Sequence, residues 1–369
     1  MYRRSGEHAT KGGIRCLFSD IDGTLVHYYE DEAAAPGPPE VLPLPASATG
    51  RKARISTETL KLAARVRTSG SRLVLVSGTR YSTFVNRLPY LPRADAYVIE
   101  NGGRIFYPKR ERGSGGGGGG GGSGDGVGGV GGASSCEAAG EEAQEEESAV
   151  GDATLTAHAA AALTEDLKWR ETMEGATGPA SQDTKAPGDR EGPLWDLYRK
   201  AVSEGFEVDT NTYYTMIRIK VKTGSSKTPS GGAGEEGTGD GKPQEAGEEE
   251  RGGEKAMKRM LDSLPSGLRV VTNFGLVDIC PERSGKHNAA AYLATEHFGV
   301  PLADCASMGD DDNDIALANS MGKGAFITTF SSESVEAAAK GDPERFTVAK
   351  SEGVLASEEM LRLILAACA

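Results

Sequence analysis

The stretch Asp20-Ile21-Asp22-Gly23-Thr24, which follows the apolar run 14–19, decides how the rest of the chain is interpreted. A second acidic stretch, Gly309-Asp310-Asp311-Asp312-Asn313-Asp314, also follows a strand-like segment, 303–308. Carboxylates crowded at the end of a buried strand repel one another and lose hydration, so folding opposes them unless a cation is bound. A hard cation held by carboxylates beside a free carboxylate nucleophile is what phosphoryl transfer needs. The two stretches therefore predict a reaction class.

The first cluster contains the residue types that phosphoryl transfer requires. Asp20 and Asp22 are two residues apart, so on an extended strand end they project to the same side. Open α/β sheets bind ligands beyond the carboxyl ends of their strands. At that edge, Asp20 can attack phosphorus and form an aspartyl phosphate. Asp22 can protonate the leaving oxygen and later accept a proton from water, while Gly23 lets the backbone turn close to the phosphate.

Surface turns, calcium loops and nucleotide loops fit the acidic clusters less well. An acidic surface turn is the simplest of the three, but D-x-D-G-T arises by chance in under roughly one chain in a hundred of this length. A calcium-binding EF-hand needs glycine at the sixth loop position, where the clusters have Leu25 and Ile315. A Walker phosphate loop needs Ser or Thr after Gly285-Lys286, where the chain has His287. These mismatches favour phosphoryl transfer by an aspartate.

The composition narrows the partners and the compartment. The chain has 369 residues and a net charge of -13, and two acidic runs, 137–152 and 235–254, account for the excess. No basic stripe predicts nucleic-acid binding, no apolar stretch approaches a membrane span, and no feature indicates a protein partner. The cysteines lie far apart without a C-x-x-C pair, which argues against a disulfide framework and a zinc site. Cytoplasm is the expected compartment, with a plastid as the alternative. The cysteines are Cys16, Cys136, Cys280, Cys305 and Cys368.

Three low-complexity segments, 111–152, 177–192 and 223–253, are rich in Gly, Ser, Pro or Glu. They contain too few apolar residues to offset the entropy of ordering, so we expect disordered surface insertions in loops.

Outside these segments the chain alternates strand-like and helix-like pieces. Ser56 or Thr57 can cap a helix that ends near Gly70, and the branched run 73–76 is typical of a buried parallel strand. This alternation predicts an α/β fold with a doubly wound, Rossmann-like parallel sheet. In the middle of the chain the helix-like and strand-like segments follow a different pattern, which predicts an inserted α+β cap domain. We expect a discontinuous core of residues 13–105 and 271–369, with a cap of residues 106–270.

Two further signals follow predicted strands. Ser77, Gly78, Thr79 and Arg80 come after the strand 73–76, where a hydroxyl and backbone N–H groups can hold phosphate oxygens. Lys286 precedes a predicted helix at Asn288, so its charge and the helix N-terminus could both neutralise a phosphate. Each signal is weak alone, because Ser-Gly turns and solvated lysines are common. They gain value from their order relative to the acidic clusters.

In this order, Asp20-x-Asp22-Gly-Thr, Ser77, Lys286 and Gly309-Asp310-x-x-Asn313-Asp314 resemble the four motifs of the haloacid dehalogenase (HAD) superfamily. The long insertion between the second and third motifs resembles a C2-type cap. The segment Val98-Ile99-Glu100-Asn101-Gly102-Gly103 is similar to the core-to-cap junction of the Cof and sucrose-phosphatase-like branch, subfamily IIB.

The resemblance implies magnesium-dependent chemistry. Asp20 would be the nucleophile, Asp22 the general acid and base, and Ser77 and Lys286 the ligands of the phosphoryl group. The implied magnesium ligands and their supports are Asp20, Asp22 through its carbonyl, Asp310, Asn313 and Asp314. The implied substrate-binding residues are Thr24, Gly78, Thr79, Arg80 and Asn101. Relatives of the Cof type have Arg directly after Ser-Gly or Thr-Gly, whereas here Thr79 intervenes, so the role of Arg80 stays open.

The cap would choose the substrate. Arg218, Lys220 and Lys222 form a basic strand face that could meet an anion, although a solvated face is the simpler interpretation. Four aromatic residues could stack on a sugar, although most are expected in the core. The resulting hypothesis is a magnesium-dependent phosphatase for a small phosphate ester, such as a sugar phosphate. A phosphomutase and a non-catalytic phosphometabolite-binding protein are the alternatives. The aromatic residues are Trp195, Tyr198, Tyr213 and Tyr214.

Overall fold

The main sheet of the computed structural model confirms the predicted α/β class. The structure describes residues 12–29, 40–109, 156–220, 255–273 and 276–368. Eight strands are ordered β15-β14-β13-β1-β5-β6-β7-β8, and all neighbours from β15 to β6 are parallel. The last two strands, β7 and β8, are antiparallel additions. The strands are β1 (Cys16–Asp20), β5 (Arg72–Val76), β6 (Ala96–Ile99), β7 (Arg104–Pro108), β8 (Leu163–Glu165), β13 (Cys305–Gly309), β14 (Ala325–Ile327) and β15 (Phe346–Val348).

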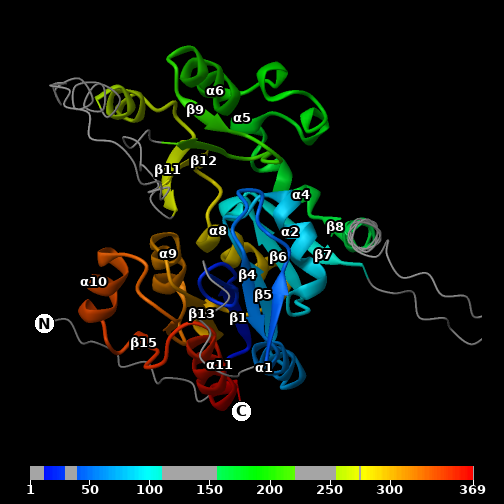
Figure 1. Cartoon of the computed structure of the whole chain (residues 1–369), viewed down its shortest axis with the longest axis vertical. Helices are drawn as coiled ribbons and strands as arrows, with labels where there is room; N and C mark the ends of the chain where they lie inside the picture. The colour runs from blue at the N-terminus through cyan, green and yellow to red at the C-terminus, as the bar shows by residue number, and fades with distance from the viewer. Residues whose placement is uncertain (1–11, 30–39, 110–155, 221–254, 274–275, 369) are drawn as a thin grey trace, which may run out of the picture.

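Helices cover both faces of this sheet (Figure 1). Successive strand residues point to opposite faces, so Leu17 and Phe18 of β1 lie in two separate apolar clusters. One cluster joins the sheet to α1 (Thr57–Thr68), α2 (Tyr81–Arg87) and α11 (Val354–Cys368). The other joins it to α4 (Leu167–Glu171), α8 (Lys286–Tyr292) and α9 (Asp312–Ser320). A further helix, α10 (Glu333–Gly341), packs beside β14 and β15. The sheet is therefore doubly wound, as predicted.

Helix α1 shows how local sequence sets these elements. The Oγ atom of Ser56 accepts a hydrogen bond from the backbone N–H of Thr59 at 3.0 Å, which confirms the predicted cap. Leu62, Ala63 and Val66 recur at helical spacing and are buried against the sheet. Capping and burial of one face together fix where α1 begins and how it packs.

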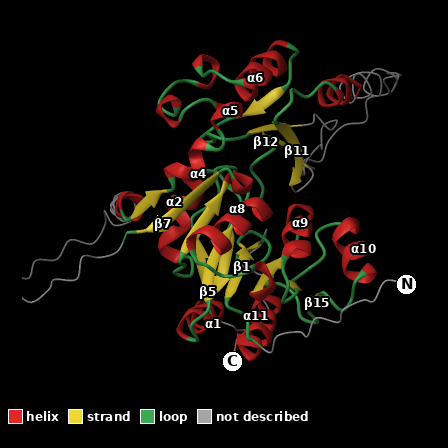
Figure 2. Ribbon diagram, turned by 180° about the vertical axis from the view of Figure 1, so that it is seen from behind, coloured by secondary structure: helices red, strands yellow, loops and turns green. Residues whose placement is uncertain are grey.

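A second, four-stranded antiparallel sheet lies beyond one end of the main sheet (Figures 1 and 2). Its order is β11-β12-β10-β9, and α6 (Pro193–Ser203) packs on it. Ile217 and Ile219 are buried against Leu194 and Trp195 of that helix. The strands are β9 (Glu207–Asp209), β10 (Ile217–Lys220), β11 (Leu268–Asn273) and β12 (Leu276–Pro281). A third, small sheet has the order β2-β4-β3, with β2 (His27–Tyr28), β3 (Val41–Leu44) and β4 (Ala53–Ser56).

The predicted boundaries at 105/106 and 270/271 fall inside strands. β7 belongs to the main sheet as far as Pro108, and the second sheet continues through β12 to Pro281. A strand's own pattern shows that one of its faces is buried, but it does not show which sheet the strand joins. The turn between β6 and β7 packs against the segment that returns from β12 to α8, because a Cβ atom on Gly102 would approach the carbonyl oxygen of Gly285 to 2.3 Å.

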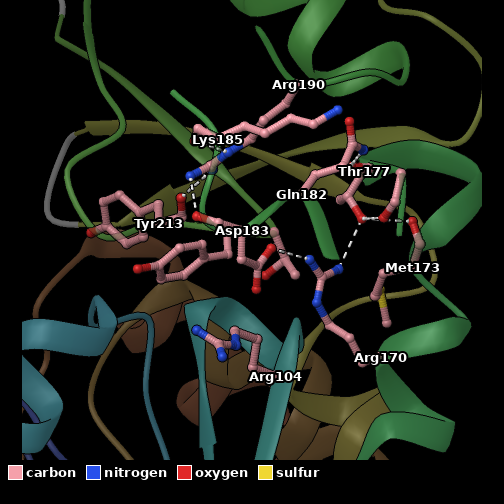
Figure 3. A network of polar contacts seen from close by, with 12 residues as sticks. Arg104, Arg170, Met173, Thr177, Gln182, Asp183, Lys185, Arg190 and Tyr213 are labelled. Carbon is pink, nitrogen blue, oxygen red and sulfur yellow. Dashed lines mark hydrogen bonds and ion pairs between the residues drawn. The ribbon is translucent and has the colours of Figure 1, made fainter. Parts of the chain in front are cut away.

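The prediction that residues 177–192 are disordered was wrong. This segment contains the 3-10 turns Ala180–Gln182 and Pro187–Asp189. Buried arginines stabilise it, as Figure 3 shows. Arg190 donates to the backbone carbonyls of Lys185, Asp183 and Tyr213 at 3.0, 3.1 and 3.1 Å. Arg170 donates to Asp183 Oδ1 at 2.9 Å. The low apolar content of this segment suggested disorder. Hydrogen bonds from charged arginine side chains stabilise it instead of the burial of apolar side chains. The other two predicted insertions, 111–152 and 223–253, lie outside the described residues.

A smaller difference concerns one helix start, because the helix predicted from Asn288 begins at Lys286. Across the described ranges, no helix combines the length and apolar character needed to cross a membrane.

Arg190→Met should destabilise the protein by about 3 kcal/mol, because a charged hydrogen bond contributes about 1.5 to 3 kcal/mol and buried carbonyls lose their donor. Urea denaturation would measure the change, and limited proteolysis should cut within 177–192 earlier than in wild type. Arg93→Met, at an exposed arginine, is the matched control and should cost under about 0.5 kcal/mol. Equal costs for the two variants would contradict the stabilising role of Arg190.

Candidate active site

The parallel pairing of β1 with β13 brings the two acidic clusters together. Asp20 ends β1, and Asp310 directly follows β13, so both lie at the carboxyl edge of the main sheet. Asp314 joins them from the first turn of α9. One carboxylate oxygen from each of these three buried aspartates lies within 4.8 Å of the other two. The structure thus assembles the predicted cluster from segments almost three hundred residues apart in sequence.

Lys286 partly neutralises this cluster. It is the first residue of α8, and its Nζ atom donates to Asp20 Oδ1 at 2.6 Å and to Asp314 Oδ1 at 2.7 Å. Burial alone would lower the pKa of Lys286, but the two carboxylates raise it above its ordinary value. The lysine is therefore held as a cation beside the candidate nucleophile.

One lysine does not balance three carboxylates. Burial raises the pKa of Asp20 well above its ordinary value, against the opposing effect of Lys286. Burial also raises the pKa of Asp310, and the charge of Asp314 adds to that rise. A divalent cation bound here would reverse both effects.

The residues present fit magnesium. Asp20, Asp310 and Asp314 supply oxygen atoms, which Mg²⁺ prefers as ligands. The Oδ1 atom of Asn313 is buried without a hydrogen-bond partner, and Asn313 lines the same cavity. An unsatisfied buried oxygen beside three carboxylates suits a cation or one of its water ligands.

The structure places Gly23 and Thr24 against Asp310. The Thr24 hydroxyl donates to Asp310 Oδ1 at 2.7 Å and is fully buried, so it does not reach the cavity in which a substrate contact was predicted. Gly23 has a φ of 86°, and a Cβ atom there would lie 2.1 Å from Asp310 Oδ2. The glycine therefore makes room for the carboxylate of Asp310, whereas the sequence interpretation assigned that room to the phosphate.

Asp22 is held by residues from three segments. The Ser77 hydroxyl donates to Asp22 Oδ2 at 3.2 Å and accepts from the backbone N–H of Thr79 at 3.0 Å. Asp22 Oδ1 accepts from the Tyr28 hydroxyl at 2.6 Å and from Arg87 Nη1 at 2.9 Å. Burial and the charge of Asp22 raise the pKa of Tyr28, which keeps the hydroxyl protonated.

Sequence reasoning did not find Tyr28 or Arg87. Arg87 carried one usable signal, because it falls on the apolar side of its helix with Phe84 and is 2% exposed. An arginine at such a position must have a buried partner. Tyr28 carried no comparable signal.

A cavity of about 290 Å³ opens onto this cluster. Gly78, Thr79 and Arg80, which the sequence analysis assigned to substrate binding, line it. The guanidinium of Arg80 is engaged, since it donates to Asp209 Oδ1 of β9 at 3.1 Å and lies 4.7 Å from the ring centre of Tyr213. Asn101 is buried and donates to Asp278 Oδ2 at 2.9 Å, so it supports the second sheet and does not line the cavity.

The second sheet supplies the other side of the cavity. Tyr213 and Arg218 line it, and Arg218 forms a two-pronged ion pair with buried Asp278 at 2.6 and 2.8 Å. Trp195 is in the core of the second sheet, where its indole N–H donates to the carbonyl of Thr177 at 2.9 Å. Tyr198 packs against the same core, and Tyr214 does not line this cavity. The side chain of Lys220 and the whole of Lys222 lie outside the described residues.

Asp310→Asn should stabilise the metal-free protein and abolish its stabilisation by magnesium. The raised pKa of Asp310 means that its ionised form opposes folding at neutral pH. A neutral amide should relieve about 1 kcal/mol or more. Wild type should gain about 2.7 kcal/mol when magnesium is at a hundred times its Kd. Thermal unfolding with EDTA and with magnesium would measure both effects.

The control for this experiment is Asp262→Asn, at an exposed aspartate, which should keep the magnesium response. The sign of the pH dependence follows from the raised pKa. Above the ordinary carboxyl pKa the folded state binds more protons than the unfolded chain, so metal-free wild type should lose stability as pH rises until Asp310 is ionised. A wild-type Tm independent of magnesium would contradict the metal site.

Comparisons with known proteins agree with this geometry. Residues 248–349 match the family model of haloacid dehalogenase-like hydrolases, and no curated protein sequence matches the chain. The fold is similar to that of sucrose-phosphatase from Synechocystis sp. PCC6803 in complex with sucrose and phosphate, with a TM-score of 0.50, 14% identity, and 95% of this chain and 98% of that chain covered.

Two further structures are less similar. One is a HAD-superfamily phosphatase from Bacteroides thetaiotaomicron, with a TM-score of 0.44, 13% identity, and 98% of this chain and 99% of that chain covered. The other is the C-terminal domain of trehalose-6-phosphate phosphatase from C. albicans, with a TM-score of 0.41, 12% identity, and 96% and 93% covered. The family model covers the part of the chain that contains Lys286 and the second acidic cluster, and its match agrees with the resemblance seen in the four motifs.

Proposed function

We propose that this protein is a magnesium-dependent phosphatase that cleaves a small sugar phosphate through an aspartyl-phosphate intermediate. The observation that carries the proposal is the contact of Lys286 with both Asp20 and Asp314, beside Asp310 and at the wall of a cavity. A nucleophile, a fixed cation and a metal-ligand set meet there at one place. A protein that only binds phosphate would not need a carboxylate of Asp20 facing the ligand.

The residues divide the reaction between them. The carboxylate of Asp20 attacks phosphorus, and the bond to the ester oxygen breaks as Asp22 protonates that oxygen. Lys286, the Ser77 hydroxyl and the backbone N–H groups near Gly78 hold the phosphoryl oxygens. Magnesium would screen the charge between the phosphate and the carboxylates and would orient the group for in-line attack. Water then attacks the aspartyl phosphate while Asp22 accepts its proton, which releases phosphate and restores Asp20.

Three observations support a sugar as the rest of the substrate. The cavity extends from Asp20 to the second sheet, where Tyr213 and the Arg218–Asp278 pair lie. An aromatic edge with paired polar groups suits a hydroxyl-rich ligand, since it supplies apolar contact as well as donors and acceptors. The similar fold of sucrose-phosphatase, solved with sucrose and phosphate, is consistent with this choice.

The mutase alternative has less support. A mutase needs a second phosphate site in the cap. Arg218 is the cationic side chain among the described cap residues that line the cavity, and Asp278 already compensates its charge. A single phosphate site beside Asp20 therefore fits the described residues better.

Asp20→Asn should lower phosphate release at least about a thousandfold, because the covalent step loses its nucleophile. Release from a panel of sugar phosphates, with magnesium, would be measured for wild type and variant. The fold should be retained, since the amide removes a buried charge whose pKa is strongly raised. Asp304→Asn, made at the opposite end of β13, is the matched control and should keep full activity.

Retained turnover in Asp20→Asn would contradict the mechanism. Wild type that releases phosphate from none of the esters, yet interconverts sugar phosphates when a sugar bisphosphate is added, would move the reaction to a mutase.

A further inference from the structure

Arg87 and Tyr28 both bind the same oxygen of Asp22, and the two reaction steps alone do not require this contact. Arg87 is the last residue of α2, Tyr28 belongs to β2, and Asp22 follows β1, so the three come from separate segments. Both groups lie within 2.9 Å of Oδ1. Arg87 is also anchored at its other side, where Nε donates to the carbonyl of Pro45 at 3.1 Å.

The hydrogen-bond directions are fixed by the donors. A guanidinium has only donors, so Arg87 Nη1 donates both to Asp22 Oδ1 and to the Tyr28 oxygen, which lies 3.1 Å away. The Tyr28 hydroxyl accepts that bond and uses its own hydrogen toward Asp22. Oδ1 therefore accepts two hydrogen bonds.

An oxygen that accepts two hydrogen bonds is a poor place for a transferable proton. Oδ2 accepts a single, longer hydrogen bond, from the Ser77 hydroxyl at 3.2 Å, and both residues line the cavity. A hydroxyl can accept as well as donate, so Oδ2 is the oxygen on which Asp22 can carry a transferable proton. A carboxyl group without these partners could rotate and place either oxygen toward the leaving group. General acid catalysis requires the proton within hydrogen-bond reach of the leaving oxygen, so this rotation would reduce the rate.

We propose that Arg87 and Tyr28 are positioning residues that fix Oδ2 of Asp22 as the atom that gives and takes the proton. The inference rests on the proposed phosphatase function. In the first step the bond from Asp20 to phosphorus forms, the ester P–O bond breaks, and the Oδ2 proton goes to the leaving alkoxide. In the second step water attacks phosphorus, the bond from Asp20 to phosphorus breaks to release phosphate, and the proton of the water goes to Oδ2.

Leaving-group dependence separates positioning from general structural support. An alkyl phosphate, such as the best sugar phosphate of the panel, needs a proton on its leaving oxygen. 2,4-Dinitrophenyl phosphate does not, because dinitrophenolate leaves unprotonated. Rapid mixing would measure the first step for both, as single-turnover transfer from the sugar phosphate and as the burst of dinitrophenolate.

Arg87→Met should slow transfer from the sugar phosphate by about 10- to 100-fold, a part of the roughly 10²- to 10⁴-fold that general acid catalysis supplies. The dinitrophenolate burst rate should stay within about threefold of wild type, and KM should change little. Arg87→Lys, which retains a donor, should recover part of the loss. Tyr28→Phe removes one oxygen atom and should show the same selectivity if Arg87→Met does not fold.

Two controls complete the design. Asp22→Asn should show the same selectivity, with a larger loss of rate on the sugar phosphate. Adding Arg87→Met to Asp22→Asn should cause no further loss of that rate. Arg170→Met removes another buried arginine of an ion pair, with Asp183, and should leave the ratio of the two rates unchanged. If wild type shows a burst and Arg87→Met loses equally on both substrates, or loses on neither, the positioning role is wrong but the phosphatase function stands. If wild type shows neither a burst nor turnover of the sugar phosphate, the proposed function itself is wrong.

Discussion

The buried ammonium of Lys286 between Asp20 and Asp314 is the interaction on which the rest of the structure depends. Like-charged carboxylates at one sheet edge oppose folding, and this single side chain compensates part of their repulsion. The parallel pairing of β1 and β13 sets the distance between the clusters, and α8 begins at the lysine itself. The remaining negative charge is the basis of the magnesium binding proposed for this site, so the cost in stability and the proposed function have one source.

Much of this arrangement could be predicted from the sequence, because strand ends and acidic motifs carry local signals. Asp20, Lys286 and Asp310 stand beside recognisable strands or helices, and parallel strands of one sheet present their carboxyl ends together. The cap of α1 at Ser56 was equally readable, since a serine before an amphipathic run is a local feature. Predictions of this kind succeed when the deciding interaction lies within a few residues of the motif.

The rest depended on contacts between distant segments. No pattern near Asp22 indicates that Tyr28 and Arg87 will meet on one of its oxygens. The segment 177–192 looked unable to fold because apolar content was taken as the measure of order, whereas Arg190 and other arginines order it through carbonyl groups. Gly23 shows a third case, since its neighbour in space is Asp310, which the sequence places almost three hundred residues away. Long-range polar contacts are hard to predict from sequence because, unlike the apolar residues of helices and strands, they do not recur at a regular spacing along the chain.

The close approach of Gly102 and Gly285 has a mechanical meaning. Gly102 lies in the turn between β6 and β7 of the main sheet, where a side chain would collide with the backbone of Gly285. Gly285 lies where the chain returns from β12 of the second sheet to α8, and Lys286 is the next residue. The returning segment is therefore braced against the main sheet immediately before the lysine. A brace at this point keeps the ammonium in register with Asp20, whatever small shifts occur farther out in the second sheet.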